Sequence, residues 1–246
     1  MGTQERGLAT RRMILEAAGA VFSERGYSAT TVADVLKRLN LTRGAVYFHF
    51  ASKEELARAV LASQADVPAV VRDIKLQELI DLGLVFACQL TRDPVLQGSV
   101  RLSLELDSVG LDRRLPYESW VGRNREILEQ ARARGELRPH VNLQETAELL
   151  CSCFTGVQLF SHVMTGWADL EARIRTLLKH VLPNIAEPAI LLQLDLSPGR
   201  GLKVGAELRA DALAADDESG ADCVADEIDE SGAADATEKE SRRGGR

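Results

Sequence analysis

The fold is decided by residues 31–56, which have the sequence TVADVLKRLNLTRGAVYFHFASKEEL. Apolar residues recur at helical spacing over 32–39, and Asn40 marks a tight turn. Thr42 is then placed to cap a helix that ends near Phe48. A helix of about seven residues, ~10 Å long, is not stable alone, so other helices must support it. These are the parts of a helix-turn-helix, whose second helix enters the major groove of DNA.

Two further helices are predicted on either side of this motif. Residues 8–25 carry apolar side chains at helical spacing, and Gly26 occupies the position where helices usually end. On the other side, Ser52 and Glu55 form the capping box that starts a fourth helix. These two helices supply the support that the short helix needs.

The outward side of the short helix predicts the residues that meet DNA. Arg43 can give two hydrogen bonds to guanine, and the two small residues after it let the backbone approach the bases. Phosphate contacts are expected from Thr42, Tyr47 and Lys53. A lone arginine or tyrosine on a helix is more often solvated or part of the core, so the prediction rests on their combination. The predicted DNA contacts are Thr31, Thr42, Arg43, Gly44, Ala45, Tyr47, His49 and Lys53.

The charge distribution supports this assignment. The chain of 246 residues has a net charge of −7, which by itself argues against a nucleic-acid partner. Residues 1–60, however, contain nine Lys or Arg against six Asp or Glu, whereas residues 203–246 contain six against thirteen. The N-terminal part is therefore the basic part of an acidic chain, and Arg11 and Arg12 are placed to follow the DNA backbone.

The rest of the chain predicts a larger helical domain. No alternating strand pattern occurs, and only 4% of the residues are aromatic, so the expected fold class is all-α. Helices are expected over about 75–91, 93–107, 117–134, 142–165 and 168–182, the last ended by Pro183, with a short helix within 184–194. The expected domains are 1–52 for DNA binding, 53–196 for ligand binding and dimerisation, and 197–246 as an acidic disordered tail.

An apolar pocket is expected in the larger domain. An ordinary helical core explains most of its inward side chains, but the Trp120 side chain is large enough to form one wall of a cavity. Gln64 and Thr155 are candidate polar contacts, although each is more often a local hydrogen-bond partner. The predicted ligand contacts are Gln64, Leu82, Val85, Phe86, Trp120, Phe154 and Thr155.

The helix-turn-helix segment resembles the DNA-binding domain of TetR-family repressors. The resemblance is carried by Gly26-Tyr27 and by residues 30–35 (TTVADV), 41–50 (LTRGAVYFHF) and 52–56 (SKEEL). It implies an all-helical homodimer whose last two long helices, within 143–182, pack as a four-helix bundle. A dimer also suits a two-fold operator, on which the two recognition helices lie about 34 Å apart.

Residues 47–50 (YFHF) and the segment around Trp120 are further similar to the γ-butyrolactone autoregulator receptors of streptomycetes. In those receptors a tryptophan at this point packs on the bound lactone. The resemblance implies a ligand-released repressor of secondary metabolism, with double-stranded operator DNA and a small oxygenated hydrophobic signal as partners. The alternatives are a repressor of an efflux or antibiotic-response gene with another hydrophobic ligand, and a DNA-binding protein without a ligand.

Enzymatic functions find little support in the sequence. It has no Walker loop, GxSxG, HExxH or CxxC motif, and its four histidines show no metal-ligand spacing. An enzyme with a borrowed helix-turn-helix would need a catalytic constellation that is not visible, so no cofactor is expected. Cys151 and Cys153 are expected to be buried spectator thiols, with a redox switch as the alternative. Without a signal peptide or membrane span, the expected location is the cytoplasm.

Overall fold

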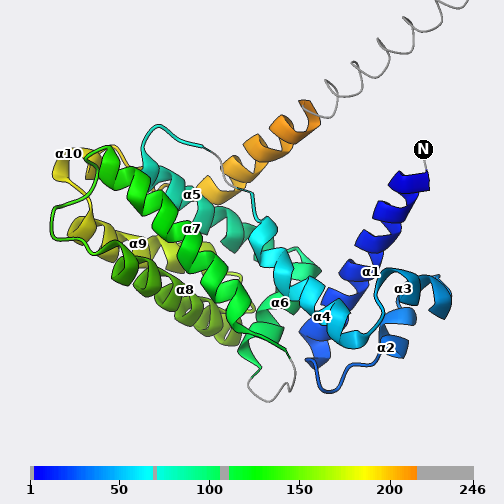
Figure 1. Ribbon diagram of the computed structural model, residues 1–246. Coiled ribbons are helices and arrows are strands. Elements are labelled where there is room, and N and C mark those ends of the chain that lie inside the picture. Colours follow the sequence, from blue (N-terminus) through cyan, green and yellow to red (C-terminus); the bar gives the residue numbers. More distant parts are fainter. Residues whose placement is uncertain (1–2, 69–70, 106–110, 215–246) are drawn as a thin grey trace, which may run out of the picture. The chain divides into compact units, whose positions relative to one another are not determined.

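The structure, a computed structural model, describes residues 3–68, 71–105 and 111–214. These residues form α-helices joined by turns, and their one β-type pairing is an isolated antiparallel bridge between Leu137 and Ala186 (Figure 1). The expected all-α fold class is confirmed. In the part of the chain that the structure describes, no helix is long and apolar enough to cross a membrane.

Helices α2 and α3 form the helix-turn-helix, and α1 and α4 support it. Helices α1 to α4 span Thr3–Arg25, Val32–Leu36, Arg43–His49 and Lys53–Ala62. The hydroxyl groups of Thr31, Thr42 and Ser52 accept backbone N–H groups in the first turns of α2, α3 and α4, and the last two caps were predicted from the sequence. Gly26 has a φ of +72°, the left-handed conformation in which glycine ends a helix. Each hydroxyl cap contributes about 1 kcal/mol to helix stability.

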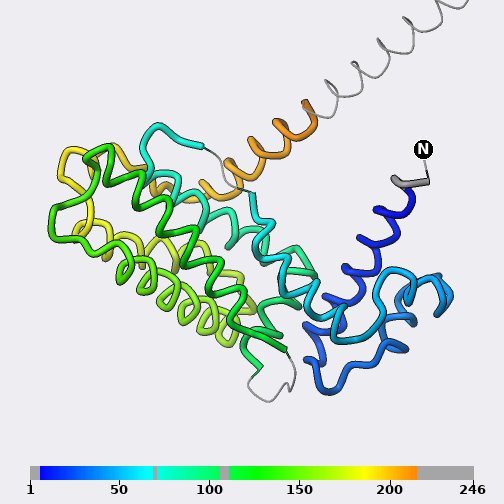
Figure 2. Tube along the Cα trace, viewed as in Figure 1, coloured from blue at the N-terminus to red at the C-terminus, as the bar shows by residue number. Residues whose placement is uncertain are grey.

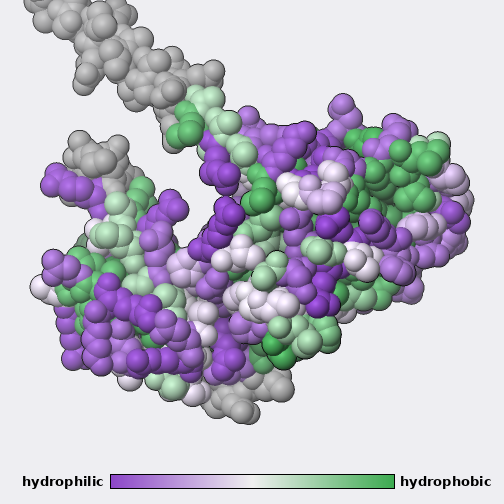
Figure 3. Space-filling model, turned by 180° about the vertical axis from the view of Figure 1, so that it is seen from behind, coloured by the Kyte–Doolittle hydropathy of each residue, from purple (hydrophilic) through white to green (hydrophobic). Residues whose placement is uncertain are grey.

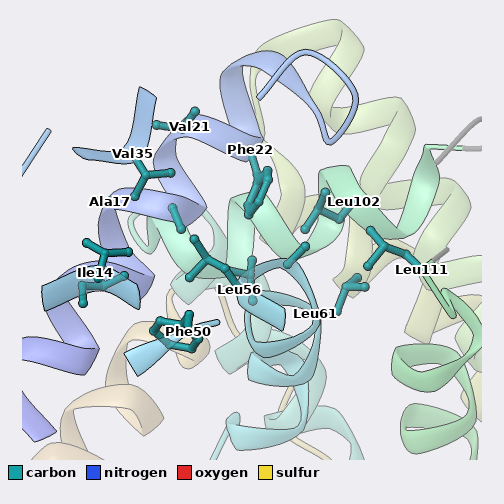
Figure 4. Close-up of a cluster of buried hydrophobic side chains, with 14 residues drawn as sticks. Ile14, Ala17, Val21, Phe22, Val35, Phe50, Leu56, Leu61, Leu102 and Leu111 are labelled. Atoms are coloured by element: carbon teal, nitrogen blue, oxygen red, sulfur yellow. The ribbon is translucent and has the colours of Figure 1, made fainter. Parts of the chain in front are cut away.

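One hydrophobic core supports the short α3. Val46 on α3 and Phe50 just after it are buried among side chains of α1 and α4. Figure 4 shows Phe22 of α1, Leu56 of α4 and Leu102 of the later helix α6 in this same cluster. The DNA-binding helices and α6 therefore share one core.

The larger domain begins after α4, which leads the chain out of the helix-turn-helix (Figure 2). A short 3-10 turn, η1, lies at Ser63–Asp66. The helices that follow are α5 (Lys75–Leu90), α6 (Pro94–Leu104), α7 (Arg114–Ala133), α8 (Leu143–Thr165), α9 (Leu170–Ile185) and α10 (Pro188–Leu191). α5 packs against α7 and α9, and α8 also packs against α7 and α9, so these four helices can enclose a cavity.

α1 and α6 cross with their backbones in direct contact. A Cβ atom on Gly98 would lie 2.7 Å from the Cα of Gly19, and a Cβ on Gly19 would lie 2.5 Å from the carbonyl oxygen of Pro94. Just past the end of α6, the Glu105 carboxylate accepts the backbone N–H of Tyr27 at 2.6 Å. The DNA-binding helices are thus fixed to α6 at two points.

Several predicted helix ends differ from the structure: α1 and α7 begin earlier than predicted, at Thr3 and Arg114, and α2 ends at Leu36 rather than near residue 39. α9 continues through Pro183 to Ile185, although the sequence analysis ended it at Pro183. Proline lacks a backbone N–H of its own, but Ala186 N–H still bonds to the carbonyl of Leu182, and burial of Leu182 and Ile185 holds the last turn. α6 ends at Leu104, and residues 106–107 of its predicted span lie outside the described residues.

The folded part of the chain extends beyond residue 197, where the sequence analysis placed the start of the tail. Residues 200–214 are helical. Arg200 pairs with the buried carboxylate of Asp81 on α5, and Val204 is buried. The sequence analysis missed this segment because an ion pair between distant residues leaves no hydrophobic pattern in the sequence. Residues 215–246, most of the predicted disordered tail, lie outside the described residues.

Candidate DNA-binding surface and ligand cavity

One side of α3 presents the predicted DNA contacts. Val46 faces the core, whereas Thr42, Arg43, Gly44 and Tyr47 are exposed, and Ala45 and His49 are partly exposed. Mostly hydrophilic side chains cover the end of the molecule formed by α1 to α3, with hydrophobic ones among them (Figure 3). At about 10 Å, α3 has the length of a recognition helix that fits the major groove.

Arg43 is held along the exposed side of α3. Its guanidinium lies 5.3 Å from the centre of the Tyr47 ring, and its Nη2 donates to the Tyr47 hydroxyl at 3.4 Å. These weak contacts place the donors of Arg43 at the surface without removing them from solvent. A Cβ atom on Gly44 would meet no atom closer than 4.0 Å, so the surface beside Arg43 is open.

Thr31 and Thr42 cap helices. The Thr31 hydroxyl accepts the backbone N–H of Asp34, and the Asp34 carboxylate accepts the backbone N–H of Thr31, which completes a capping box. Hydrogen bonds from Thr31 and Lys37 lower the pKa of Asp34 to about 2. Thr42 uses only its hydroxyl oxygen as an acceptor, from the Ala45 N–H, so its own proton can be donated to a phosphate.

Lys53 joins α4 to the turn between α1 and α2. Its ammonium donates to the carbonyl oxygens of Tyr27 at 3.0 Å and Thr30 at 2.9 Å, and it lies 4.2 Å from the centre of the Tyr27 ring. An ammonium has three N–H donors. One donor is therefore left for the phosphate contact that the sequence analysis assigned to Lys53.

The sequence analysis did not include Phe48 among the contacts. Its side chain is 85% exposed and packs edge-on against His49, with ring centres 5.2 Å apart. Helical spacing could have identified it, because Val46 and Phe50 face inward and Phe48 lies between them on the opposite side. An exposed phenyl group on α3 can make apolar contact with a thymine methyl group.

The larger domain contains an apolar cavity between α5, α6, α7, α8 and α9. Its volume, counted as the room open to the centres of water molecules, is about 70 Å³. One buried water needs roughly 10–15 Å³ by this measure, so the cavity has room for a small organic molecule. Its lining is Gln64, Leu79, Leu82, Gly83, Phe86, Val100, Ser103, Leu104, Tyr117, Trp120, Asn124, Leu150, Cys151, Phe154, Thr155, Gln158, Ile174, Leu177 and Leu178.

Three aromatic rings from three helices meet in the cavity wall. Phe86 packs edge-on against Trp120, with ring centres 5.2 Å apart, and against Phe154, at 5.5 Å. Edge-to-face contacts of this kind hold aromatic rings in fixed positions. The cavity therefore has a firm aromatic side formed by α5, α7 and α8.

A chain of hydrogen bonds leads from the cavity to α4. Trp120 Nε1 donates to the amide oxygen of Gln64 at 3.2 Å, and Gln64 Nε2 donates to the Ser99 hydroxyl at 2.8 Å. Ser99 in turn donates to the carbonyl oxygen of Leu61 on α4 at 3.1 Å. Gln64 and Ser99 are both buried. The chain connects α7, η1, α6 and α4, which are well separated in sequence.

Six of the seven predicted ligand residues line this one cavity, and Val85 does not. Val85 is buried, but its side chain leaves α5 on the side next to that of Leu82, outside the side that faces the cavity. The sequence analysis missed the polar lining residues Tyr117, Asn124 and Gln158. Helical spacing from Trp120 and Phe154 could have identified all three.

The cysteines that the structure describes are free thiols, and Cys151 is buried as expected, whereas Cys153 is only partly buried. Burial and the nearby Glu171 carboxylate raise the pKa of Cys88 to about 11, and burial raises the pKa of Cys151. Both shifts disfavour the reactive thiolate, which is the form that a redox switch needs. Among the described residues, no group of three or more His, Cys, Asp or Glu is placed to hold a metal ion.

The chain is similar to known bacterial regulators. The family model of bacterial regulatory proteins of the tetR family matches residues 14–60. The A-factor receptor protein of Streptomyces griseus is 33% identical over 246 residues, which is 100% of this chain and 87% of the receptor.

Solved structures of bacterial regulators have a similar fold over most of the length of this chain. Full-length native TylP, a TetR regulator from Streptomyces fradiae, has a TM-score of 0.78 and 45% identity, covering 82% of this chain and 98% of TylP. A γ-butyrolactone receptor described as ArpA-like has a TM-score of 0.57 and 24% identity, covering 84% of this chain and 99% of the receptor. At that identity the second likeness shows the fold alone.

Proposed function

Because the chain belongs to the TetR family of bacterial transcriptional repressors, we propose that it is a homodimer released from a palindromic operator by a small γ-butyrolactone-like or butenolide-like signal. We further propose that the genes it controls serve secondary metabolism. The observation that carries the proposal is the hydrogen-bond chain from Trp120 in the cavity to Leu61 on α4.

The DNA-binding step uses the exposed side of α3. Arg43 supplies paired donors for guanine, Phe48 an apolar contact for thymine, and Thr42 a hydroxyl for phosphate. Val46 and Phe50 pack α3 onto the hydrophobic core, so the helix is already ordered before it enters the major groove. Binding then costs little conformational entropy. The geometry supports Thr31 as the residue that positions α2 rather than as a direct base contact.

The dimer is proposed to form through α8 and α9. α8 carries an exposed apolar face, in which Val163 is 74% exposed. An apolar face of this size on a single chain favours association with a second copy. The other large members of the face are Leu149, Phe160 and Met164. Replacement of Val163 by Asp should shift the protein toward monomers in light scattering, whereas the same change at exposed Leu115 on α7 should not.

The ligand is proposed to intercept the hydrogen bond between Trp120 and Gln64. A lactone carbonyl can accept the indole N–H, and a ligand hydroxyl can bond to the amide of Gln64 or to Thr155. The apolar part of the signal then lies against Phe86 and Phe154. The presence of this cavity favours a ligand-controlled regulator over a DNA-binding protein without a ligand.

Release follows if the signal fits only one of two arrangements of the dimer. Loss of the Trp120 bond frees Gln64, which also bonds to Ser99 and through it to α4. A shift of α4 changes the spacing of the two α3 helices on the operator. The ligand can lower operator affinity by no more than the ratio of its own affinities for the two arrangements of the dimer.

The test is operator release by a synthetic γ-butyrolactone, measured by gel shift with Trp120→Phe. This change removes the indole N–H and keeps an aromatic ring, so fold and operator affinity should be preserved while release needs at least tenfold more lactone. Trp167→Phe, the chain's other tryptophan, is the matched control and should release like the wild type. If both variants were released at the same lactone concentration, the lactone would not bind at Trp120. Release only by unrelated antibiotics would favour the efflux-type regulator.

A further inference from the structure

A second hollow adjoins the cavity and reaches the DNA-binding helices. It shares the residues Val100, Leu104 and Gln158 with the cavity, which form a common wall. On its other sides it is lined by Ser23, Arg101, Glu105, Leu159, His162 and Trp167. This groove therefore touches α1, α6 and α8 together, and nothing in the proposed release mechanism uses it.

Two polar side chains in the groove wall, those of Gln158 and Trp167, make no hydrogen bond within the described part of the chain, and the indole N–H of Trp167 is fully buried. Gln158 is 7% exposed, lines both hollows and makes no hydrogen bond there. Trp167 is 7% exposed, and its indole N–H is buried without a partner. The Gln158 amide lines an open hollow without a protein partner, so its N–H donors are available to a bound molecule.

Trp167 also has an unusual backbone. Its φ of +71° is rare for a large side chain, and it directly follows Gly166, at +59°. The two left-handed residues turn the chain at the end of α8 and bring the indole onto the ring of His162, with ring centres 4.0 Å apart. The result is a flat aromatic surface beside Leu159 in the groove wall.

The charged groups that face the groove favour an anion. Arg101 is exposed and makes no ion pair among the described residues. The Glu105 carboxylate is the opposing charge, but it already accepts the backbone N–H of Tyr27 at 2.6 Å. His162 is exposed and stacked on Trp167. The guanidinium of Arg101 is therefore the charge available to a ligand.

We propose that this groove is a second ligand site, separate from the cavity, for a small amphipathic anion. The flat apolar part of the anion stacks beside Trp167 and Leu159, and its carboxylate or sulfonate pairs with Arg101. An acceptor on the same molecule takes the N–H donors of Gln158. Because Ser23 belongs to α1, an occupant touches the DNA-binding helices as well as α6 and α8.

The test uses 8-anilinonaphthalene-1-sulfonate as the probe, in the full chain carrying Trp120→Phe. Trp167 is then the chain's one tryptophan, and its emission reports binding by quenching. Quenching should saturate, and Arg101→Gln should weaken the apparent affinity at least fivefold. Arg101 is exposed, so this change leaves the fold intact, which melting curves verify.

The matched control is Arg125→Gln, an exposed arginine on α7 that pairs with Glu129 and does not line the groove. It should leave the apparent affinity unchanged. Equal affinities of the two variants would overturn the proposal, because quenching would then come from probe bound in the cavity or elsewhere. Quenching that never saturates would overturn it as well. Operator release by a lactone is measured separately, so the proposal for the groove and the proposal for the cavity can each be rejected without the other.

Discussion

Trp120 and Gln64 are joined by a hydrogen bond of 3.2 Å, although 56 residues separate them in the sequence. The bond closes one side of the ligand cavity, and the other end of the Gln64 amide is bonded to Ser99. Since Ser99 bonds to the Leu61 carbonyl, polar atoms in the cavity wall are connected to α4. On the proposed function, this arrangement would make signal binding and DNA binding compete for one geometry.

The crossing of α1 and α6 predicts a strong effect of one methyl group. Gly98→Ala would place a Cβ 2.7 Å from the Gly19 Cα, so the two backbones must move apart. We expect a loss of about 1–3 kcal/mol in the free energy of unfolding, measured by urea denaturation. Gly122→Ala is the control, because this glycine lies inside α7 with nothing within 4 Å of its Cβ position. It should gain about 0.5–1 kcal/mol.

Base recognition by α3 predicts a sequence-specific loss. Arg43→Ala should weaken operator binding by about 1–3 kcal/mol while non-specific binding falls much less, because paired donors to a guanine are lost. Fluorescence anisotropy with operator and scrambled duplexes measures both. Arg114→Ala, an exposed arginine on α7, is the control and should change neither. Intact operator affinity after Arg43→Ala would show that α3 is not the recognition helix.

The capping box of α2 predicts an acid transition. The pKa of Asp34 is lowered to about 2 in the folded protein, against an ordinary value of about 3.9. A lowered pKa stabilises the fold above the ordinary value, and this stabilisation is lost as pH falls from about 4 toward 2. Thermal melting across this range should show a smaller pH dependence for Asp34→Asn than for the wild type. Identical slopes would mean that Asp34 is not the titrating group.

The packing of residues 197–204 predicts where the chain can be shortened. A stop after Ser197 removes Arg200, and the buried Asp81 then keeps only the Arg72 pair. It also removes the buried Val204. We expect Tm to fall by roughly 5 °C or more, because a buried carboxylate loses a partner. A stop after Ala214 should leave Tm unchanged. Equal Tm values for the two truncations would show that the segment adds nothing to stability.

Local chemistry explains what the sequence predicts well. Thr31, Thr42 and Ser52 cap the first turns of their own helices, so the starts of α2, α3 and α4 follow from neighbouring residues. The exposed side of α3 follows from helical spacing in the same way. The cavity side of α5 was predicted because Leu82 and Phe86 lie one turn apart on one face.

Contacts between distant residues explain what the sequence does not predict. Nothing near Gly98 shows that it meets Gly19, and nothing near Lys53 shows that two carbonyls take two of its donors. The bond from Glu105 to the Tyr27 N–H spans 78 residues. Each depends on how helices pack, and ion pairs and glycine contacts leave no periodic pattern in a single sequence.

The central claim is that the hydrogen-bond chain through Ser99 connects the ligand cavity to α4, and Ser99→Ala tests it most directly. Ser103→Ala is the control, because this serine also lines the cavity but bonds to the Val100 carbonyl of its own helix and not to α4. The measurement is operator affinity as a function of a synthetic γ-butyrolactone, with Trp120 fluorescence reporting lactone binding. The account predicts that Ser99→Ala binds the lactone and the operator but is released at least tenfold less effectively than Ser103→Ala. Equal release by the two variants would contradict it.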